Sequence, residues 1–234
     1  MKISAPGLVA IAQHEGIVLG PYKDSVGVWT YGIGSTKHAT GMDPLHMPHV
    51  DTRRWSRIEV TNELRRIFER FDADLDQYEA RVNRAVKVPL KQHQFDALVS
   101  WDFNTGGALW RSKSGQPASL IRQINAGDMS GGTNSNGFYG WLKPPELKGR
   151  RKKERDLFRT GNYNHEGRIL IYDAHGDGKM SIRASITAAD LLQLLRDFGF
   201  GIGNKPLPDA PENGGFDLIK WIIEMVLKLL GVKR

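Results

Sequence analysis

A long run of apolar residues at helical spacing, between positions 56 and 86, constrains the fold more than any other feature of the sequence. Ser56 followed by Glu59 is the capping-box pattern that opens many helices. Behind it, apolar side chains recur every three or four residues, at Leu64, Ile67, Phe68, Phe71, Leu75, Tyr78 and Val82. The segment therefore predicts one long amphipathic helix.

Other segments add shorter helices and a little sheet. Helices are expected over residues 4–16, after Pro89 as far as the glycines at 106 and 107, and in the stretches PASLIRQINAG and GRRKKERDLFRTG. Residues 22–33 are rich in β-branched and aromatic side chains and in glycine, which predicts a small hairpin or meander. One small sheet with at least five helices predicts an α+β fold whose elements are segregated.

Changes in composition and residue pattern divide the chain into a main domain of residues 1–165 and three shorter segments. Residues 166–202 hold a strand-like stretch, RILIYD, a turn, AHGDGK, and a helix capped by Thr187, which predicts a strand-turn-helix appendage. Residues 203–215 are rich in Pro, Gly and Asn and predict a linker. Residues 216–234 predict an amphipathic C-terminal helix with a wide apolar arc.

Composition limits the chemistry and the partners. The chain has no cysteine, which excludes disulfides, thiolate nucleophiles and Cys-ligated zinc. A net charge of +7 favours an anionic partner such as nucleic acid, phospholipid headgroups or an acidic wall polymer, without choosing among them. The first residues imitate a secretory signal but are too short for one, so we expect no cleavable signal peptide.

The stretch HEGIVLGPYKDSVGVWTYGIGST, from residue 14, sets Glu15, Asp24 and Thr30 nine and six residues apart. A Glu at a helix end, shielded by Ile17 and Leu19, would have its pKa raised by desolvation, which suits a general acid. An ionised Asp24 and a water held by Thr30 would complete the two-carboxylate chemistry of glycoside hydrolysis. Most such carboxylate pairs are solvated surface charges, so the spacing alone leaves both interpretations open.

The same stretch resembles the catalytic signature of the phage-type lysozymes, or endolysins, of glycoside hydrolase family 24. In that signature a Glu, eight residues, an Asp, five residues and a Thr are followed by Gly-x-Gly. The residues in register here are Glu15, Asp24, Thr30, Gly32 and Gly34. Two further family motifs follow in the same order, matched by QHQFDALVSWDFNTGG and RRKKERDLF, so that the resemblance spans residues 14–158.

The resemblance implies a two-lobed lysozyme-like fold, with a small β-hairpin lobe, a larger helical lobe and a cleft between them. It implies a muramidase that hydrolyses, with inversion, the β-1,4 bond between N-acetylmuramic acid and N-acetylglucosamine in bacterial peptidoglycan, leading to host cell lysis. Glu15 would be the general acid, while Asp24 and Thr30 would position the attacking water.

The family pattern also implies substrate contacts. Gly32 and Gly34 would let the glycan approach the backbone, Phe103 aligns with an aromatic residue that borders the cleft, and Ser119 aligns with a polar residue near it. The sequence departs from the pattern at Ser35, where many members have His, and at PPELKG, which lacks the usual hydrophobic pair before RRKKERDLF.

Other signals favour ordinary structural roles. His14 is expected to be a polar residue on the outer helix face, and His38, His46 and His49 do not have a recognised ligand spacing. The stretch DAHGDGKMSIRA resembles a calcium loop, but Ala184 stands where the bidentate acid belongs, so a strand-to-helix turn is expected. The basic run 150–153 predicts a solvated helix face. We expect no metal, no cofactor and no nucleic acid partner.

The location and the competing functions follow from the same features. We expect a monomer that accumulates in the host cytoplasm and reaches the periplasm and wall through a membrane lesion, with residues 216–234 docking on the body, pairing with another copy or contacting the membrane. One alternative is a lytic transglycosylase acting on the same bond. The other is a non-enzymatic protein that acts on walls or membranes through its C-terminal helix.

Overall fold

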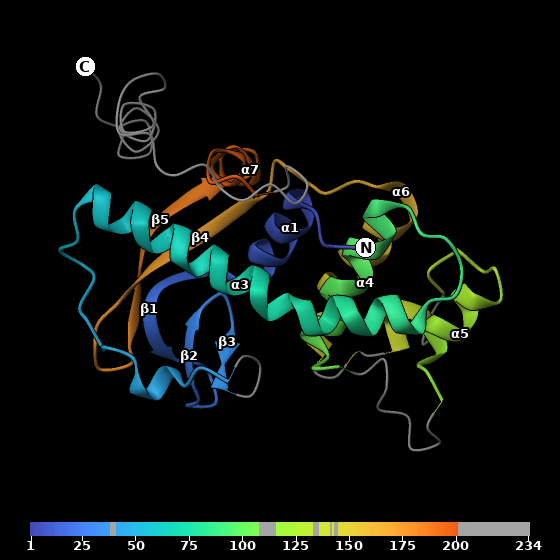
Figure 1. Cartoon of the computed structure of the whole chain (residues 1–234), viewed down its shortest axis with the longest axis horizontal. Coiled ribbons are helices and arrows are strands. Elements are labelled where there is room, and N and C mark those ends of the chain that lie inside the picture. The colour runs from blue at the N-terminus through green and yellow to red at the C-terminus, as the bar shows by residue number, and fades with distance from the viewer. Residues whose placement is uncertain (38–40, 108–115, 133–135, 141, 143–144, 201–234) are drawn as a thin grey trace. The chain divides into compact units, whose positions relative to one another are not determined.

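The computed structural model describes residues 1–200 apart from 38–40, 108–115, 133–135, 141 and 143–144 (Figure 1). These residues form two compact units. Unit 1 consists of Met1–His14 and Asp74–Asn164, and unit 2 consists of Glu15–Ala73 and the described residues from His165 onward. The expected linker 203–215 and C-terminal helix 216–234 lie outside the described residues.

Each helix expected within the described residues is present, and the fold is α+β as predicted. The α-helices are α1 Ala5–Glu15, α3 Arg57–Ala85, α4 Gln92–Asn104, α5 Ser119–Asn125, α6 Lys148–Thr160 and α7 Ala188–Asp197. The strands are β1 Ile17–Lys23, β2 Trp29–Gly32, β3 Ser35–Thr36, β4 Arg168–Ala174 and β5 Met180–Thr187. Short 3-10 helices occur at η1 Pro44–His46, η3 Gly137–Gly140 and η4 Pro145–Leu147. None of the described helices combines the length and hydrophobicity that a bilayer span requires.

Unit 1 is helical, and a buried carboxylate ties its elements together. Asp96 on α4 is 1% exposed and accepts hydrogen bonds from the Ser4 hydroxyl, from Gln92 Nε2 at 2.8 Å and from the Tyr163 hydroxyl at 2.7 Å. Burial raises the pKa of Asp96, and the three donors oppose that rise because they favour the charged form. The N-terminus of α1, α4 and the segment after α6 are thus joined at one point.

The basic run at the start of α6 is only in part the solvated face that its sequence predicts, because Lys152 and Lys153 are exposed whereas the two arginines are buried. Arg150 and Arg151 are 8% and 0% exposed, and both contact the buried carboxylate of Glu154. The spacing explains the difference, because residues three and four apart lie on one side of a helix. Glu154 also accepts a hydrogen bond from Ser100 on α4 at 2.9 Å, so this ion cluster holds α6 against α4.

Unit 2 contains a five-stranded sheet in the order β3-β2-β1-β4-β5 (Figure 1). β1 and β2 form the predicted hairpin, and β3 continues it antiparallel to β2. β1 begins at Ile17 rather than near Tyr22. Its register is irregular between Val18 and Pro21, where Leu19 and Gly20 have no partner in the register and Pro21 pairs with Tyr31. On its other side β1 pairs in parallel with β4, so residues before and after position 165 share one sheet.

The segment 166–202 contains one more strand than the sequence indicated. MSIRASIT, treated as part of a turn, forms β5 and pairs antiparallel with β4 from Arg168↔Thr187 to Ala174↔Met180. The loop that resembles a calcium site therefore joins two strands, not a strand and a helix. Its Asp173 carboxylate already accepts hydrogen bonds from Thr52 at 3.0 Å and Arg183 at 2.7 Å. Within the described residues no group of three or more His, Asp and Glu side chains could hold a metal ion.

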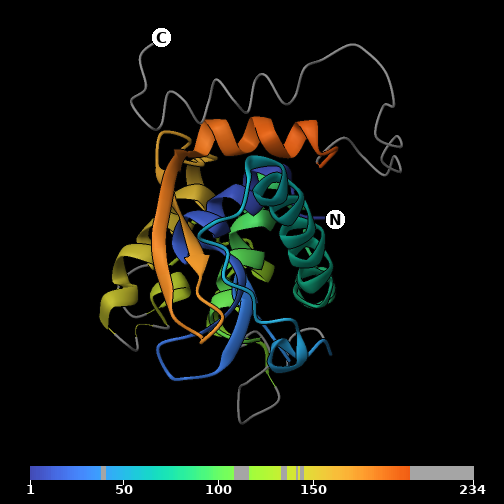
Figure 2. The same cartoon turned by 90° about the vertical axis from the view of Figure 1, so that its left-hand side faces the viewer.

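The core of unit 2 lies between the sheet and two helices. From the first half of α3, Ile67, Phe68 and Phe71 are at most 1% exposed, and the Tyr31 hydroxyl of β2 donates to Glu63 at 2.7 Å. Helix α7 follows β5 directly and lies across the end of that strand (Figure 2). Its Thr187 cap accepts a hydrogen bond from the Asp190 N–H, as the sequence predicted for this helix start.

Candidate active site

The β1–β2 hairpin and the residue that precedes it bring three predicted site residues into unit 2. Glu15 ends α1, and Gly16 then turns the chain into β1 with a φ of +74°, a left-handed conformation that suits glycine at a helix C-terminus. Asp24 follows β1 directly, and Thr30 lies within β2. A short helix-to-strand turn and one hairpin are therefore enough to position all three.

The Asp24 carboxylate organises the hairpin loop. Its Oδ1 accepts hydrogen bonds from the backbone N–H groups of Val26, at 3.0 Å, and Val28, at 2.8 Å. The Asp24 N–H in turn donates to the Val28 carbonyl at 3.0 Å. Among the described residues Oδ2 has no hydrogen-bond partner, so one oxygen of a fixed carboxylate remains for a ligand or a water.

Thr30 is a buried polar residue next to this carboxylate loop. It is 2% exposed, and its hydroxyl donates to the Val28 carbonyl at 3.1 Å. Because that bond uses the hydroxyl proton, Oγ1 is left as an acceptor. A water bound here would donate one proton to Thr30 Oγ1, and its lone pairs would remain free to accept or to attack.

Glu15 does not have the apolar shielding expected from its sequence neighbours. Ile17 and Leu19 are both fully buried in the core, whereas Glu15 is exposed. Strand residues that face the core cannot also desolvate a carboxylate at the surface, so the apolar shielding predicted for Glu15 is not found.

A residue that the sequence analysis missed lies close to both carboxylates. Burial raises the pKa of the Tyr22 hydroxyl, and the negative charges of Glu15 and then Asp24 raise it further, while a hydrogen bond from the Gly34 backbone N–H opposes the rise. Charges act on one another in this way only over short range in a protein. The sequence did contain a signal for Tyr22, because residues two apart in a strand project to the same face and Tyr22 is two residues before Asp24.

The other residues predicted to contact the substrate lie in both units. Gly32, in unit 2, has a φ of +61°, and a Cβ there would approach Ile67 to 2.8 Å. Gly34 also has a positive φ, at +71°. Phe103 and Ser119 belong to unit 1, where Phe103 packs edge-to-face on Tyr78 at 5.3 Å between ring centroids and Ser119 begins α5.

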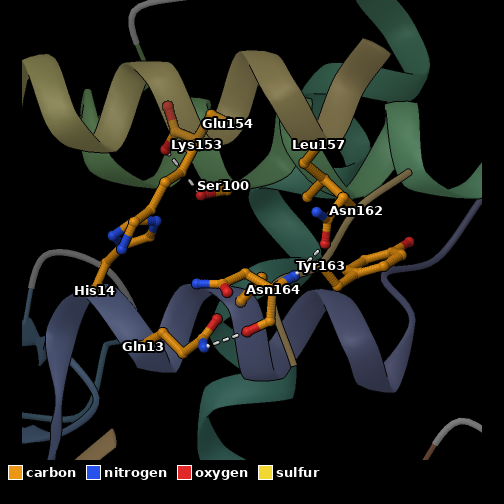
Figure 3. Close-up of a pocket in the computed structure, with 10 residues that line it drawn as sticks. Gln13, His14, Ser100, Lys153, Glu154, Leu157, Asn162, Tyr163 and Asn164 are labelled. Carbon is orange, nitrogen blue, oxygen red and sulfur yellow. Dashed lines mark hydrogen bonds between the residues drawn. The ribbon is translucent and has the colours of Figure 1, made fainter. Parts of the chain in front are cut away.

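A small cavity of unit 1 surrounds His14, which is half-buried and not on an outer face as the sequence suggested. Figure 3 shows its ring pointing from α1 toward Lys153 on α6. Burial, followed by the charges of Arg150, Lys153 and Arg151, lowers the pKa of His14 to about 3. The cavity, about 30 Å³, has room for about two waters but not for a sugar ring.

Comparison with known proteins decides the family. The model of the phage lysozyme family matches residues 12–154. The chain belongs to the phage lysozyme family. It is 33% identical to an endolysin of Acyrthosiphon pisum secondary endosymbiont phage 1, over 68% of this chain and 99% of that protein. It is 31% identical to the endolysin of Salmonella phage P22, over 68% of this chain and 98% of the relative.

One further endolysin sequence and one solved structure are also similar to this lysozyme. A SAR-endolysin of Escherichia phage Mu is 35% identical over 52% of this chain and 58% of the relative. Among solved structures, an endolysin from Escherichia coli O157:H7 phage FAHEc1 matches with a TM-score of 0.50 and 28% identity, over 70% of this chain and 96% of that chain. The residues matched by the family model include the hairpin that carries Asp24 and Thr30.

Proposed function

We propose that this lysozyme is an endolysin that cleaves the β-1,4 bond between N-acetylmuramic acid and N-acetylglucosamine in bacterial peptidoglycan. Its membership of the phage lysozyme family, with relatives named endolysins, supports a peptidoglycan-hydrolysing role. The observation that carries the mechanism is the placement of Glu15, Asp24 and Thr30 by one helix-to-strand turn and one hairpin, with the Asp24 carboxylate held by two loop N–H groups. Two carboxylates near one point are what acid-assisted glycoside hydrolysis requires.

In the proposed mechanism, the protonated Glu15 carboxyl donates its proton to the glycosidic oxygen as the bond to the anomeric carbon breaks. A water bound by the second oxygen of Asp24 and by Thr30 Oγ1 attacks the same carbon from the opposite face. Asp24 accepts the proton of this water, and attack from the opposite face inverts the anomeric configuration. The fixed loop hydrogen bonds of Asp24 keep the water in place between turnovers.

The buried acceptor of Thr30 favours hydrolysis over lytic transglycosylation. Transglycosylation closes an anhydro ring with a hydroxyl of the substrate and needs no bound water. A threonine whose proton is already used by the Val28 carbonyl is suited to hold a water that donates to it. Released fragments with reducing muramic-acid ends would support hydrolysis, and anhydro ends would support the alternative.

The substrate contacts proposed for Gly32, Gly34, Phe103 and Ser119 concern glycan binding and not the chemical step. We further propose that the protein acts as a monomer without a nucleic acid partner, accumulates in the host cytoplasm and reaches the wall through a membrane lesion. Residues 216–234 are proposed to contact the membrane. Vesicle leakage by the full chain, compared with a chain lacking residues 204–234, tests this, and equal leakage would exclude it.

The principal test is digestion of purified peptidoglycan by the wild type and by Glu15→Gln, with the fragments identified by mass spectrometry. The variant keeps the shape of the side chain and loses the transferable proton, so no fragments are expected from it. Glu166→Gln, which changes another exposed glutamate of unit 2, is the matched control and should digest like the wild type. Undiminished release by Glu15→Gln would remove Glu15 as the acid.

A further inference from the structure

Asp102 is a fully buried carboxylate of unit 1 that the proposed mechanism does not use. It lies on α4 directly before Phe103, one of the residues proposed to contact the glycan. Its side chain is 0% exposed, and its Oδ2 accepts a hydrogen bond from Arg81 Nε on α3 at 2.6 Å. Burying two charges costs solvation free energy that their attraction often does not recover, so the pair is weak evidence of a gain in stability. What the pair does fix is the position of the Arg81 guanidinium.

This guanidinium covers an aromatic ring of its own helix. Tyr78 lies three residues before Arg81, and residues at this spacing are neighbours on one side of a helix. The guanidinium carbon lies 4.4 Å from the centre of the Tyr78 ring, and Tyr78 is 7% exposed. Gly107 leaves room for the arrangement, since a Cβ there would lie 3.2 Å from the same guanidinium carbon. Cation–π attraction in this buried setting restricts the Tyr78 ring.

The Tyr78 ring in turn contacts Phe103. The two rings meet edge to face, with 5.3 Å between their centroids and 66° between their planes. This is a preferred geometry of aromatic pairs, and it restricts the direction of each ring. Four side chains of α3 and α4, those of Tyr78, Arg81, Asp102 and Phe103, thus form a closed network, here called the Arg81 network. Phe103 remains partly exposed, so one part of its ring is held while another part can meet a ligand.

We propose that Arg81 is a positioning residue for substrate binding: held by Asp102, it fixes the Tyr78 ring and thereby sets the direction in which Phe103 meets a sugar of the glycan strand. The inference rests on the proposed contact between Phe103 and the glycan, and not on the roles of Glu15 and Asp24. An aromatic side chain that is already held in its bound direction loses less conformational entropy on binding. The Arg81 network therefore acts on affinity for the glycan and not on the chemical step.

This role has a distinct signature in the kinetic constants. Loss of binding that is equal in the ground state and the transition state raises KM and leaves kcat unchanged. Lys at position 81 keeps a positive charge for Asp102 but lacks the planar guanidinium that covers Tyr78. A change that only weakened the fold would lower the fraction of folded enzyme, and therefore the apparent kcat, with KM unchanged.

The test is a double-mutant cycle of Arg81→Lys and Phe103→Ala in the full chain, assayed by reducing-end release from soluble uncrosslinked glycan strands. The temperature is kept well below the melting temperature of every variant. We expect Arg81→Lys to raise KM about threefold to tenfold with kcat within about twofold of the wild type. In the Phe103→Ala background, where KM is already raised, Arg81→Lys should have no further effect on KM, because Arg81 acts on the glycan only through this ring.

Glu154→Gln is the matched control, because it removes one partner of another buried ion cluster of unit 1. It should lower the melting temperature without changing KM. Asp102→Asn keeps the shape of the side chain and removes the charge that holds Arg81, so it should raise KM as Arg81→Lys does. It replaces Arg81→Lys in the same cycle where that variant does not fold.

The outcomes separate this inference from the contact on which it rests. A raised KM in Phe103→Ala with a wild-type KM in Arg81→Lys would overturn the role of Arg81 and keep the glycan contact of Phe103. An unchanged KM in Phe103→Ala would overturn both, while Glu15→Gln still tests the chemical step. Equal rises of KM from Arg81→Lys in the two backgrounds would show that Arg81 does not act through Phe103 and would also refute the proposal.

Discussion

The ion cluster that holds α6 against α4 makes a quantitative prediction for Glu154→Gln. The wild-type carboxylate is 2% exposed and contacts Arg150 Nε at 3.0 Å, Arg151 Nη1 at 3.1 Å and the Ser100 hydroxyl at 2.9 Å. Gln keeps the volume and one acceptor oxygen, so it can retain the Ser100 hydrogen bond. It removes the negative charge that Glu154 supplies to the two buried guanidinium groups.

The magnitude follows from the cost of removing one partner of a buried ion pair. Breaking a buried ion pair by removing one partner costs about 3–5 kcal/mol. Arg151 also donates to Asn104, and the retained Ser100 contact limits the loss, so we expect about 3 kcal/mol. In a domain of this size that corresponds to a fall in melting temperature of roughly 6–12 °C.

The assay is urea unfolding followed by circular dichroism at neutral pH, with Asp156→Asn as the control on the same helix. Asp156 pairs with Lys152 at 2.5 Å, but the two side chains are 38% and 69% exposed, and such surface pairs contribute about 0–1 kcal/mol. High salt should abolish the small effect of the control and leave the Glu154 effect largely unchanged, because buried pairs are poorly screened. A Glu154→Gln variant within about 1 kcal/mol of the wild type would refute the reasoning.

Two further predictions concern the hairpin and the cavity of unit 1. Gly32→Ala should lower the free energy of unfolding by about 1–3 kcal/mol, because the new Cβ meets Ile67 and the backbone φ is left-handed. Gly27→Ala is the control: its φ is also left-handed, but no atom lies within 4 Å of the new Cβ, so it should cost less. Equal losses of stability for the two variants in urea unfolding would contradict the steric argument. The lowered pKa of His14 means that the unfolded chain binds more protons between about pH 6.5 and 3, so stability falls as pH falls through that window and is unaffected above it. His14→Gln should make the free energy of unfolding depend less on pH in this window, whereas His46→Gln, at an exposed histidine, should not. If His14→Gln and the wild type lose stability in parallel as pH falls, His14 is not buried in its neutral form.

Local patterns predicted the helices and the hairpin because their signals are contained in neighbouring residues. The capping box at Ser56 is present as a reciprocal pair of hydrogen bonds with Glu59, and the apolar residues from Leu64 to Val82 are buried along α3. The stretch from Tyr22 to Ile33 likewise predicted the hairpin, which has Asp24 directly after β1 and Thr30 within β2. For these elements, secondary structure and position follow from the same short stretch of chain.

Burial was predicted poorly where it depends on contacts with other elements of the fold. Arg150 and Arg151 both contact Glu154, which accepts from Ser100 of α4, and Arg151 also donates to Asn104 of α4. Glu15 is exposed although its apolar neighbours are not, since those neighbours belong to the core face of β1. No periodicity within either segment records these long-range contacts.

The pairing of β4 with β1 matters most for the proposed site, because it changes what supports β1. The sequence boundary at residue 165 treated the following segment as an appendage, yet β4 pairs with β1 at Ile17↔Ile171 and Val18↔Tyr172, and β5 pairs with β4. The Tyr172 ring also lies beside Gly16, where a Cβ would approach it to 3.0 Å. The strand that runs from Glu15 to Asp24 is thus hydrogen-bonded on one side by the hairpin and on the other by residues from beyond 165. Since a sheet strand keeps its position through both neighbours, the precision of the carboxylate pair depends on a segment that lies more than 140 positions away in the sequence.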